Sequence, residues 1–191
     1  MKIYLVRHGQ TNSNLNGVFN TLDEDINENG IKQAEELREK IRDLDYEVVY
    51  CSPLKRTIHT ANIVNVQNKS VIYDERLVER KFLRLAGKPL ETVNREEYWN
   101  YYSDKKFEDE ETVKELFERV HGFLEELKTK SYKSVLIVAH SGVSKAFYSY
   151  FKGIPEDGKF LKLGLKNCEI AEYNLEIVDI YDENKKMKSK I

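Results

Sequence analysis

The chain has 191 residues, of which 40% are hydrophobic and 34% charged. These proportions are typical of one globular domain of ordinary size and exclude an intrinsically disordered chain. With 31 basic and 33 acidic side chains the net charge is −2, so the charge balance favours neither a nucleic acid nor a membrane surface as a partner. The apolar runs fall far short of the ~20 residues of a membrane span, and the first residues lack the layout of a signal peptide. We therefore expect a cytoplasmic protein.

Alternating apolar runs and helical periodicities predict a chain of strands and helices. The helix after the second strand is expected to begin at Ser52-Pro53, because serine is a good N-cap and proline suits a first turn. In chain order the predicted elements are a strand at Lys2 to Val6, a helix at 30–44, a strand at Glu47 to Cys51, the helix from Ser52-Pro53, a strand at Val71 to Tyr73, a short helix near 94–102, a long amphipathic helix at Val113 to Leu127, a strand at Ser134 to Ala139, a helix at 142–151 and a hairpin of Cys168 to Tyr173 with Glu176 to Tyr181.

This alternation predicts an α/β fold, a three-layer α/β/α sandwich with a mostly parallel central sheet. The strand at Ser134 to Ala139 is the most apolar and is expected in the centre of the sheet. Because no linker or repeat interrupts the chain, we expect residues 1–182 to form a single domain with a lid-like insertion at residues 80–110. Residues 183–191 are expected to form a basic, solvated C-terminal tail.

The two cysteines, Cys51 and Cys168, lie in apolar, strand-like runs. Neither belongs to a Cys-x-x-Cys pair or to a Cys/His cluster with zinc-ligand spacing. We expect two buried, reduced thiols and no metal site.

Two histidines directly follow two predicted strands. Arg7-His8-Gly9 ends the first strand, and His140-Ser141-Gly142 follows the strand at Ser134 to Ala139. In an open α/β sheet ligands bind at the carboxyl ends of the strands, and a histidine flanked by arginine there indicates phosphate chemistry. By itself, Arg7-His8-Gly9 could equally hold a structural histidine. The other histidines, His59 and His121, lie within helical patterns and are assigned to structure.

Three further side chains suit phosphate chemistry. Arg56 lies in the first turn of a predicted helix, where free N–H groups, the helix dipole and a guanidinium fork all favour an anion. Asn14 follows His8 by six residues, and its amide can donate to a phosphate oxygen. Glu79 could deliver the proton that a leaving oxygen needs. Outside this context each would be an ordinary surface or turn residue.

Together these segments resemble the histidine phosphatase superfamily, which includes the cofactor-dependent phosphoglycerate mutases. The resemblance covers nearly the whole chain and implies a phosphoglycerate mutase-like fold. The segments that carry it are Arg7-His8-Gly9-Gln10-Thr11 with Asn14, Asn27-Glu28-Asn29-Gly30, Ser52-Pro53-Leu54-Lys55-Arg56-Thr57, Leu77-Val78-Glu79, Ala139-His140-Ser141-Gly142 and Asn167-Cys168-Glu169-Ile170. After Glu79, however, residues 80–87 differ from the glycine and Trp-Glu-Gly stretch of many family phosphatases.

The resemblance implies a role for each matching residue. His8 is the nucleophile that becomes a phosphohistidine, and Glu79 is the general acid and later the base that activates water. Several residues are expected to bind the phosphoryl group or the substrate: Arg7, Arg56, His140, Asn14, Asn20, Thr21 and the backbone N–H of Ser141. The arginines beside His8 would disfavour its protonated form. No cofactor or metal is expected, because the arginines supply the positive charge, and the implied partner is a small phosphorylated metabolite.

Three functions remain open at this stage. Hydrolysis is favoured over phosphoglycerate mutase activity, because Arg95 is the only arginine between Pro89 and Glu111 and Phe82 stands where the mutases usually have tyrosine. A non-catalytic phospho-ligand-binding module is disfavoured, because all the core motif residues are present. The aromatic segment 98–102 could wall a leaving-group site or pack on the sheet, and the basic run 80–88 could hold a second anion or be a solvated loop. The physiological substrate and the oligomeric state stay open.

Overall fold

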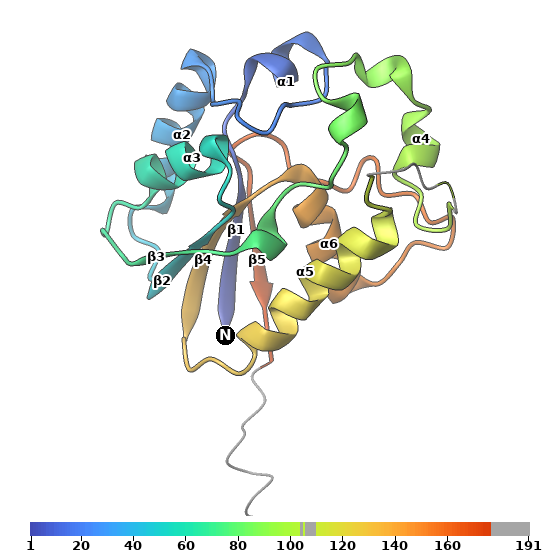
Figure 1. The fold of residues 1–191 in the computed structure, drawn as a ribbon. Helices are drawn as coiled ribbons and strands as arrows, with labels where there is room; N and C mark the ends of the chain where they lie inside the picture. Colours follow the sequence, from blue (N-terminus) through green and yellow to red (C-terminus); the bar gives the residue numbers. More distant parts are fainter. Residues whose placement is uncertain (104, 106–109, 177–191) are drawn as a thin grey trace, which may run out of the picture.

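The computed structural model describes residues 1–103, 105 and 110–176. Its centre is a five-stranded sheet in the order β3-β2-β4-β1-β5 (Figure 1). Strands β1 to β4 are mutually parallel, and β5 is antiparallel to its neighbour β1. The strand bounds are β1 Lys2–Arg7, β2 Val48–Cys51, β3 Val71–Tyr73, β4 Ser134–Ala139 and β5 Ile170–Asn174. The prediction that the most apolar strand is central is confirmed, since β4 has two strands on each side.

Helices cover both faces of this sheet. In Figure 1, α2 (Glu28–Ile41) and α3 (Lys55–Val64) lie on one side, and α5 (Val113–Leu127) and α6 (Ser141–Lys152) lie on the other. The predicted three-layer α/β/α sandwich is therefore confirmed. The remaining short elements are α1 Asn12–Asn16, η1 Glu75–Leu77, η2 Leu83–Leu85, η3 Leu90–Thr92 and α4 Arg95–Tyr98.

The alternation of side chains along β1 explains the two cores. Ile3 and Leu5 pack into the cluster that contains α5 and α6. Tyr4 and Val6 point the other way, into the cluster of α2 and α3. Successive strand residues face opposite sides of a sheet, and because helices cover both sides, the strand must be apolar throughout. Because both faces of β1 and β4 are buried, polar side chains can occur only where these strands end.

The helix after β2 begins later than predicted. Ser52 is not its N-cap: α3 starts at Lys55, and its N-cap residue Leu54 makes no side-chain cap bond. Instead, the backbone N–H of Ser52 extends the sheet by donating to Val138, and its hydroxyl pairs with His140 across the sheet edge. A long-range polar contact thus replaces the local cap that the sequence indicates.

Other boundaries also differ from prediction. Helix α2 runs from 28 to 41 instead of 30 to 44, because the side chain of Asn27 accepts from the N–H of Gly30 and caps the helix earlier. Helix α4 spans only four residues of the expected 94–102, and α6 extends one residue beyond the expected 142–151 at each end.

The predicted hairpin is corrected in part. β5 begins at Ile170 and pairs with β1, while the predicted partner strand at Glu176 to Tyr181 lies outside the described residues except for Glu176. Cys168 precedes the strand in a left-handed conformation with φ 53°. Both thiols are free, as expected, but only Cys51 is fully buried.

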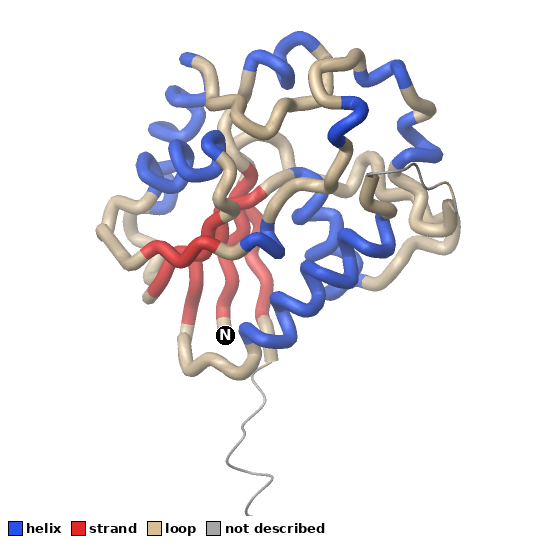
Figure 2. Tube along the Cα trace, in the orientation of Figure 1, coloured by secondary structure: helices blue, strands red, loops and turns tan. Residues whose placement is uncertain are grey.

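The described part of residues 80–110 consists of short helices joined by loops, which Figure 2 shows at the same end of the sheet as α1. Backbone contacts tie this segment to the loop after α1. Phe19 donates to the carbonyl of Lys88 and accepts from Gly87, and Val18 forms a bridge with Pro89. Its function as a lid stays a prediction. The basic tail at 183–191 lies outside the described residues, and none of the described helices has the length and apolar character to cross a membrane.

Candidate active site

The sheet brings the two strand-end histidines together. β1 and β4 are parallel neighbours with Arg7 opposite Ala139, so the next residue of each strand, His8 and His140, emerges at the same edge. Their ring centroids are 5.2 Å apart, and each side chain is only 1% exposed. The predicted juxtaposition at the carboxyl ends of the strands is what the structure contains.

His8 is held as a neutral ring with one nitrogen available. Its Nδ1 lies 2.7 Å from the carbonyl oxygen of Gly9, and because a carbonyl can only accept, Nδ1 must carry the proton. Nε2 then keeps its lone pair. Burial lowers the pKa of His8 well below its usual value, and the positive charges of Arg7 and Arg56 lower it further. The arginines were expected from the sequence to have this effect, but burial is the larger cause.

Three buried nitrogens near His8 have no hydrogen-bond partner in the part of the chain that the structure describes. The guanidinium of Arg7 donates through Nη1 to the carbonyl of Leu165, and that of Arg56 donates to the carbonyl of Thr21. Among the described residues, however, Nε of each arginine has no hydrogen-bond partner, and neither has Nδ1 of His140. An unsatisfied buried polar group costs about 1–3 kcal/mol, so a cluster of them marks a place for a ligand.

His140 can present a donor to such a ligand. Its Nε2 lies 2.8 Å from the hydroxyl of Ser52. If that hydroxyl donates to Nε2, Nδ1 carries the proton and faces outward as an unpaired N–H. Burial lowers the pKa of His140 well below its usual value, and Arg56, His8 and Arg7 lower it further. The ring is therefore neutral at neutral pH.

Glu79 lies against the start of α6. Both carboxylate oxygens accept from the backbone N–H of Gly142, at 3.1 and 3.2 Å, and Oε1 also accepts from the N–H of Arg80. A Cβ at Gly142 would lie 2.1 Å from Oε1, so only glycine leaves room for the carboxylate. The first turn of a helix favours an anionic side chain, which explains this location.

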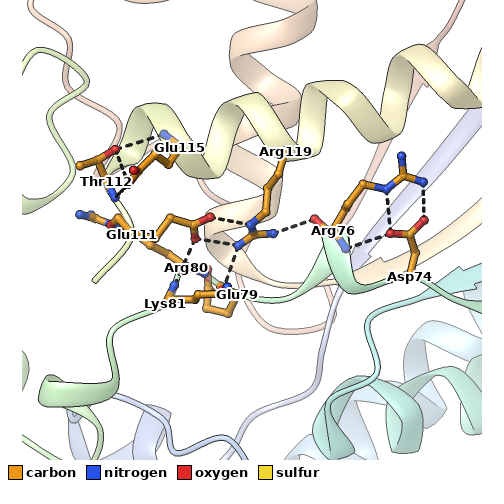
Figure 3. A network of polar contacts seen from close by, with 9 residues as sticks. All are labelled: Asp74, Arg76, Glu79, Arg80, Lys81, Glu111, Thr112, Glu115 and Arg119. Carbon is orange, nitrogen blue, oxygen red and sulfur yellow. Dashed lines mark hydrogen bonds and ion pairs between the residues drawn. The ribbon is translucent and has the colours of Figure 1, made fainter. Parts of the chain in front are cut away.

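A second arginine network fixes the main chain around Glu79 (Figure 3). Arg119 of α5 donates to the carbonyl of Arg76 at 2.7 Å and to that of Glu79 at 3.2 Å, and it pairs with the carboxylate of Glu111. Arg76 is held in turn by Asp74. Arg119 was not singled out from the sequence, since nothing in the helical pattern separates it from other polar residues of α5.

A cavity of about 350 Å³ lies over this edge of the sheet. Five residues singled out from the sequence line it: Arg7, Asn14, Asn20, Glu79 and Ser141. A neighbouring cavity of about 330 Å³ is lined by Arg56 and shares Glu79 with the first. The two cavities also share Asn20 and Phe82, so they adjoin each other. His8 and His140 are buried and are not among the residues that line either cavity.

The predicted substrate-binding residues differ in placement. Asn14 uses its carbonyl oxygen to accept from Asn167, at 3.0 Å, so its NH₂ group remains as a donor. Asn20 lines both cavities. Thr21 is not brought into the cavity: its hydroxyl donates to Asp23, and its contribution is the carbonyl that receives Arg56.

The alternatives for the aromatic and basic segments are partly resolved. Trp99 lines the cavity, whereas Tyr98 is buried against Phe19 and Tyr102 is 54% exposed. In the basic run, Arg80 is buried instead of solvated: its guanidinium stacks 3.9 Å over the ring of Tyr98 and donates to the carbonyl of Glu111.

Some cavity residues were not singled out as functional from the sequence, Lys145 above all. The histidines assigned to structure lie elsewhere, His59 beside Asp25 and His121 beside Ser149. Within the described part of the chain, no group of three or more His, Cys, Asp or Glu side chains is arranged to hold a metal ion.

The chain is similar to known phosphatases and phosphoglycerate mutases. Residues 3–187 match the model of the histidine phosphatase superfamily (branch 1). Phosphoserine phosphatase 1 of Hydrogenobacter thermophilus is 30% identical, over 92% of this chain and 87% of the relative. The 2,3-bisphosphoglycerate-dependent phosphoglycerate mutase of Thermoplasma acidophilum is 31% identical, over 93% of this chain and 89% of the relative. The solved structure of Bacillus stearothermophilus YhfR shares the fold, with a TM-score of 0.79 at 22% identity, covering 91% of this chain and 90% of that one.

These matches confirm the family resemblance, the phosphoglycerate mutase-like fold and the expectation of a phosphomonoester hydrolase. They cover the strand-end motifs and the helices between them, and not one short segment alone. The chain belongs to the histidine phosphatase superfamily, branch 1.

Proposed function

We propose that this protein hydrolyses a small phosphorylated metabolite through a phosphohistidine on His8, without a metal ion. The observation that carries the proposal is the state of His8: a buried, neutral ring whose Nδ1 is bound to the Gly9 carbonyl and whose Nε2 has no hydrogen bond to any described residue. Around it lie the unpaired Nε atoms of Arg7 and Arg56. A nucleophile with a lone pair and a set of unpaired cationic donors are the two requirements of covalent phosphoryl transfer.

In the first step, the Nε2 lone pair of His8 forms a bond to phosphorus as the bond to the leaving oxygen breaks. Glu79 donates its proton to that oxygen, so the alcohol leaves neutral. Negative charge on the equatorial oxygens is stabilised by donors from Arg7, Arg56 and His140, which take the part that metal ions play in other phosphoryl transfer enzymes. Asn14 and the N–H of Ser141 add further donors.

In the second step, water attacks phosphorus and the P–N bond breaks. The Glu79 carboxylate accepts the proton from the water, which returns the acid to its starting state, and inorganic phosphate leaves. His8 regains its neutral form with the proton still on Nδ1. The Gly9 carbonyl supports both steps, because it stabilises positive charge on the ring while Nε2 is bonded to phosphorus.

The relatives support hydrolysis and leave one second candidate. A phosphatase and a mutase both match at about 30% identity, so phosphoglycerate mutase activity deserves its own assay. A mutase must keep water away from the phosphoenzyme while the substrate turns. Within the described residues of 80–110, Arg95 is the only arginine that lines the cavity over the histidines, which favours hydrolysis.

The test uses a chromogenic aryl phosphate in a buffer that contains a chelator. The wild-type protein is expected to turn over steadily, and His8→Ala is expected to fold but to lose activity. An active His8→Ala variant would remove the phosphohistidine from the mechanism, and loss of activity in chelator would remove metal independence.

Two further measurements separate the other candidates. Interconversion of phosphoglycerates that depends on a bisphosphorylated primer would establish the mutase. Binding of phosphorylated ligands with no release of phosphate from any of them would establish a non-catalytic module.

A further inference from the structure

A buried lysine lies in the cavity, and the proposed mechanism gives it no role. Lys145 of α6 is 3% exposed. Its Nζ donates to the hydroxyl of Ser141 at 2.9 Å, one helical turn earlier, and lies 4.5 Å from the centroid of the Trp99 ring. A Cβ at Gly164 would lie 2.3 Å from Nζ, so the glycine opposite leaves the space that the ammonium group occupies.

Within the described residues, this ammonium forms no ion pair, and Glu79 acts on it only from a longer distance. In the described ranges, no carboxylate oxygen lies within 4.0 Å of Lys145 Nζ, and its protein contacts are a hydroxyl and an aromatic face. Burial lowers the pKa of Lys145 to about 8, with Glu79 opposing and Arg7 and Arg95 adding to the decrease. The group is therefore still mostly protonated at neutral pH. A buried charge without a partner is unfavourable, and an anionic ligand would relieve it.

The charges around the cavity do not balance with phosphate alone. Its lining includes the cations Arg7, Arg95, Lys145 and Lys166, and the only carboxylate among the lining residues is Glu79. A bound phosphoryl group offsets Arg7 and, at the neighbouring cavity, Arg56. Lys145, Arg95 and Lys166 remain without a phosphate partner, and of these three only Lys145 is buried; Lys145 lies on α6 and Arg95 on α4.

The position of Lys145 relative to the phosphate follows from its contact with Ser141. The backbone N–H of Ser141 is a proposed phosphoryl donor, and the side chain of the same residue accepts from Nζ. An anion held by Lys145 would thus lie a short distance from the phosphoryl group, on the same small molecule. A cavity of about 350 Å³ has room for a compact substrate of this kind.

We propose that Lys145, assisted by Arg95, binds a carboxylate carried by the leaving group, so that the natural substrates are phosphomonoesters of short hydroxy acids. The inference rests on the proposed function and adds a substrate class to it. Lys145 is a specificity residue in this account: it contacts the part of the substrate that leaves, and the phosphoryl group is bound by other side chains.

The test compares two phosphomonoesters that differ in one group. O-phosphoserine carries a carboxylate and O-phosphoethanolamine lacks it, while both carry the same phosphate and amine. We expect wild type to prefer phosphoserine in kcat/KM. In Lys145→Met, which keeps the length of the side chain and removes the charge, the ratio of the two kcat/KM values should fall by about tenfold or more. Lys152→Met, at the exposed end of the same helix, is the matched control and should keep the wild-type ratio.

The wild-type protein provides a second readout that needs no variant. Because kcat/KM reports the free enzyme, the preference for phosphoserine should decline as pH rises through about 8 and the ammonium loses its proton. The charged groups that face Lys145 are Glu79 from the loop after η1, Arg7 from β1 and Arg95 from α4. The arginines stay protonated in this range, and the shared amine cancels in the ratio.

The possible outcomes distinguish a failure of the proposed carboxylate site from a failure of the proposed phosphatase activity. No phosphate release from any ester, an aryl phosphate included, would contradict the proposed function. Aryl phosphate hydrolysis with no preference for the carboxylate, or with a preference that Lys145→Met changes by less than threefold, would overturn the role of Lys145 and leave the phosphatase intact. If Lys145→Met fails to fold, a wild-type preference that is unchanged between about pH 7 and about pH 9.5 has the same meaning, since the group titrates between them.

Discussion

Gly142→Ala tests the role of Glu79 without removing its carboxylate. The added Cβ would lie 2.1 Å from Oε1 of Glu79 and 3.0 Å from a ring carbon of Trp99. An ordinary carbon–oxygen contact is about 3.2 Å or longer, so the carboxylate must move by roughly 1 Å. The carboxylate is the end of a flexible side chain, so it can retreat while the backbone stays in place.

The cost to stability is expected to be small. Alanine is favoured over glycine in a helix by about 1 kcal/mol. The lost hydrogen bond between the Gly142 N–H and Glu79 is worth a similar amount. The two effects nearly cancel, so the variant should fold as wild type does. A displacement of about 1 Å in a catalytic group can nevertheless cost on the order of 10²-fold in rate.

The assay compares kcat/KM for an alkyl phosphate and for a nitrophenyl phosphate. An alkoxide needs a proton to leave, whereas nitrophenolate does not, so Gly142→Ala should slow the alkyl ester about 10²-fold and the aryl ester much less. Glu79→Gln should give the same pattern. Gly122→Ala on α5, where a Cβ would meet nothing within 4 Å, is the control and should leave both values unchanged. Equal slowing of both esters by Gly142→Ala would refute the assignment of Glu79 as the acid.

Two other outcomes follow from the geometry. Arg119→Gln removes the donors to the carbonyls of Arg76 and Glu79. Because Arg119 positions the acid, kcat/KM for alkyl phosphates should fall about tenfold, with a smaller effect on aryl esters. Equal kcat/KM values for variant and wild type would show that these hydrogen bonds of Arg119 are not needed for catalysis. The buried, neutral His8 and His140 have pKa values well below 6.5, so the unfolded chain binds more protons below that pH. The free energy of unfolding should therefore fall on acidification from about pH 7 to about pH 5.5, with a slope that approaches about 1.4 kcal/mol per pH unit for each histidine. Urea titrations in phosphate-free buffer measure this slope, and a flat profile would mean that the rings are already charged in the native state.

The sequence predicts the part of the site that depends on strand order. A histidine directly after each of two apolar strands indicates a common edge, and the pairing of β1 with β4 brings His8 and His140 within 5.2 Å. Arg56 at a helix start also follows from local pattern. In these cases the information lies within a few residues of the functional group. Glu79 is different, because only its place in the family motif separates it from the other glutamates of the chain.

The rest depends on contacts that no local pattern contains. Lys145 occurs in an apolar helix and reads as an ordinary surface lysine, and its burial depends on distant segments that include Trp99 and Gly164. Arg119 acts through carbonyl groups about 40 residues away in the chain. Ser52 has the composition of an N-cap, but its hydroxyl is used by His140, 88 residues later. Local propensity is a weak predictor where a tertiary contact competes for the same group.

The most direct test of the central claim is the chemical identity of the trapped phosphoenzyme. The protein is mixed with an aryl phosphate, denatured within the first turnover, and analysed by mass spectrometry and phosphorus NMR under alkaline conditions. Because Nδ1 of His8 is bonded to the Gly9 carbonyl, the account predicts phosphate on Nε2 of His8. Phosphate on Nδ1, on His140 or on a hydroxyl group, or turnover with no covalent intermediate, would contradict it.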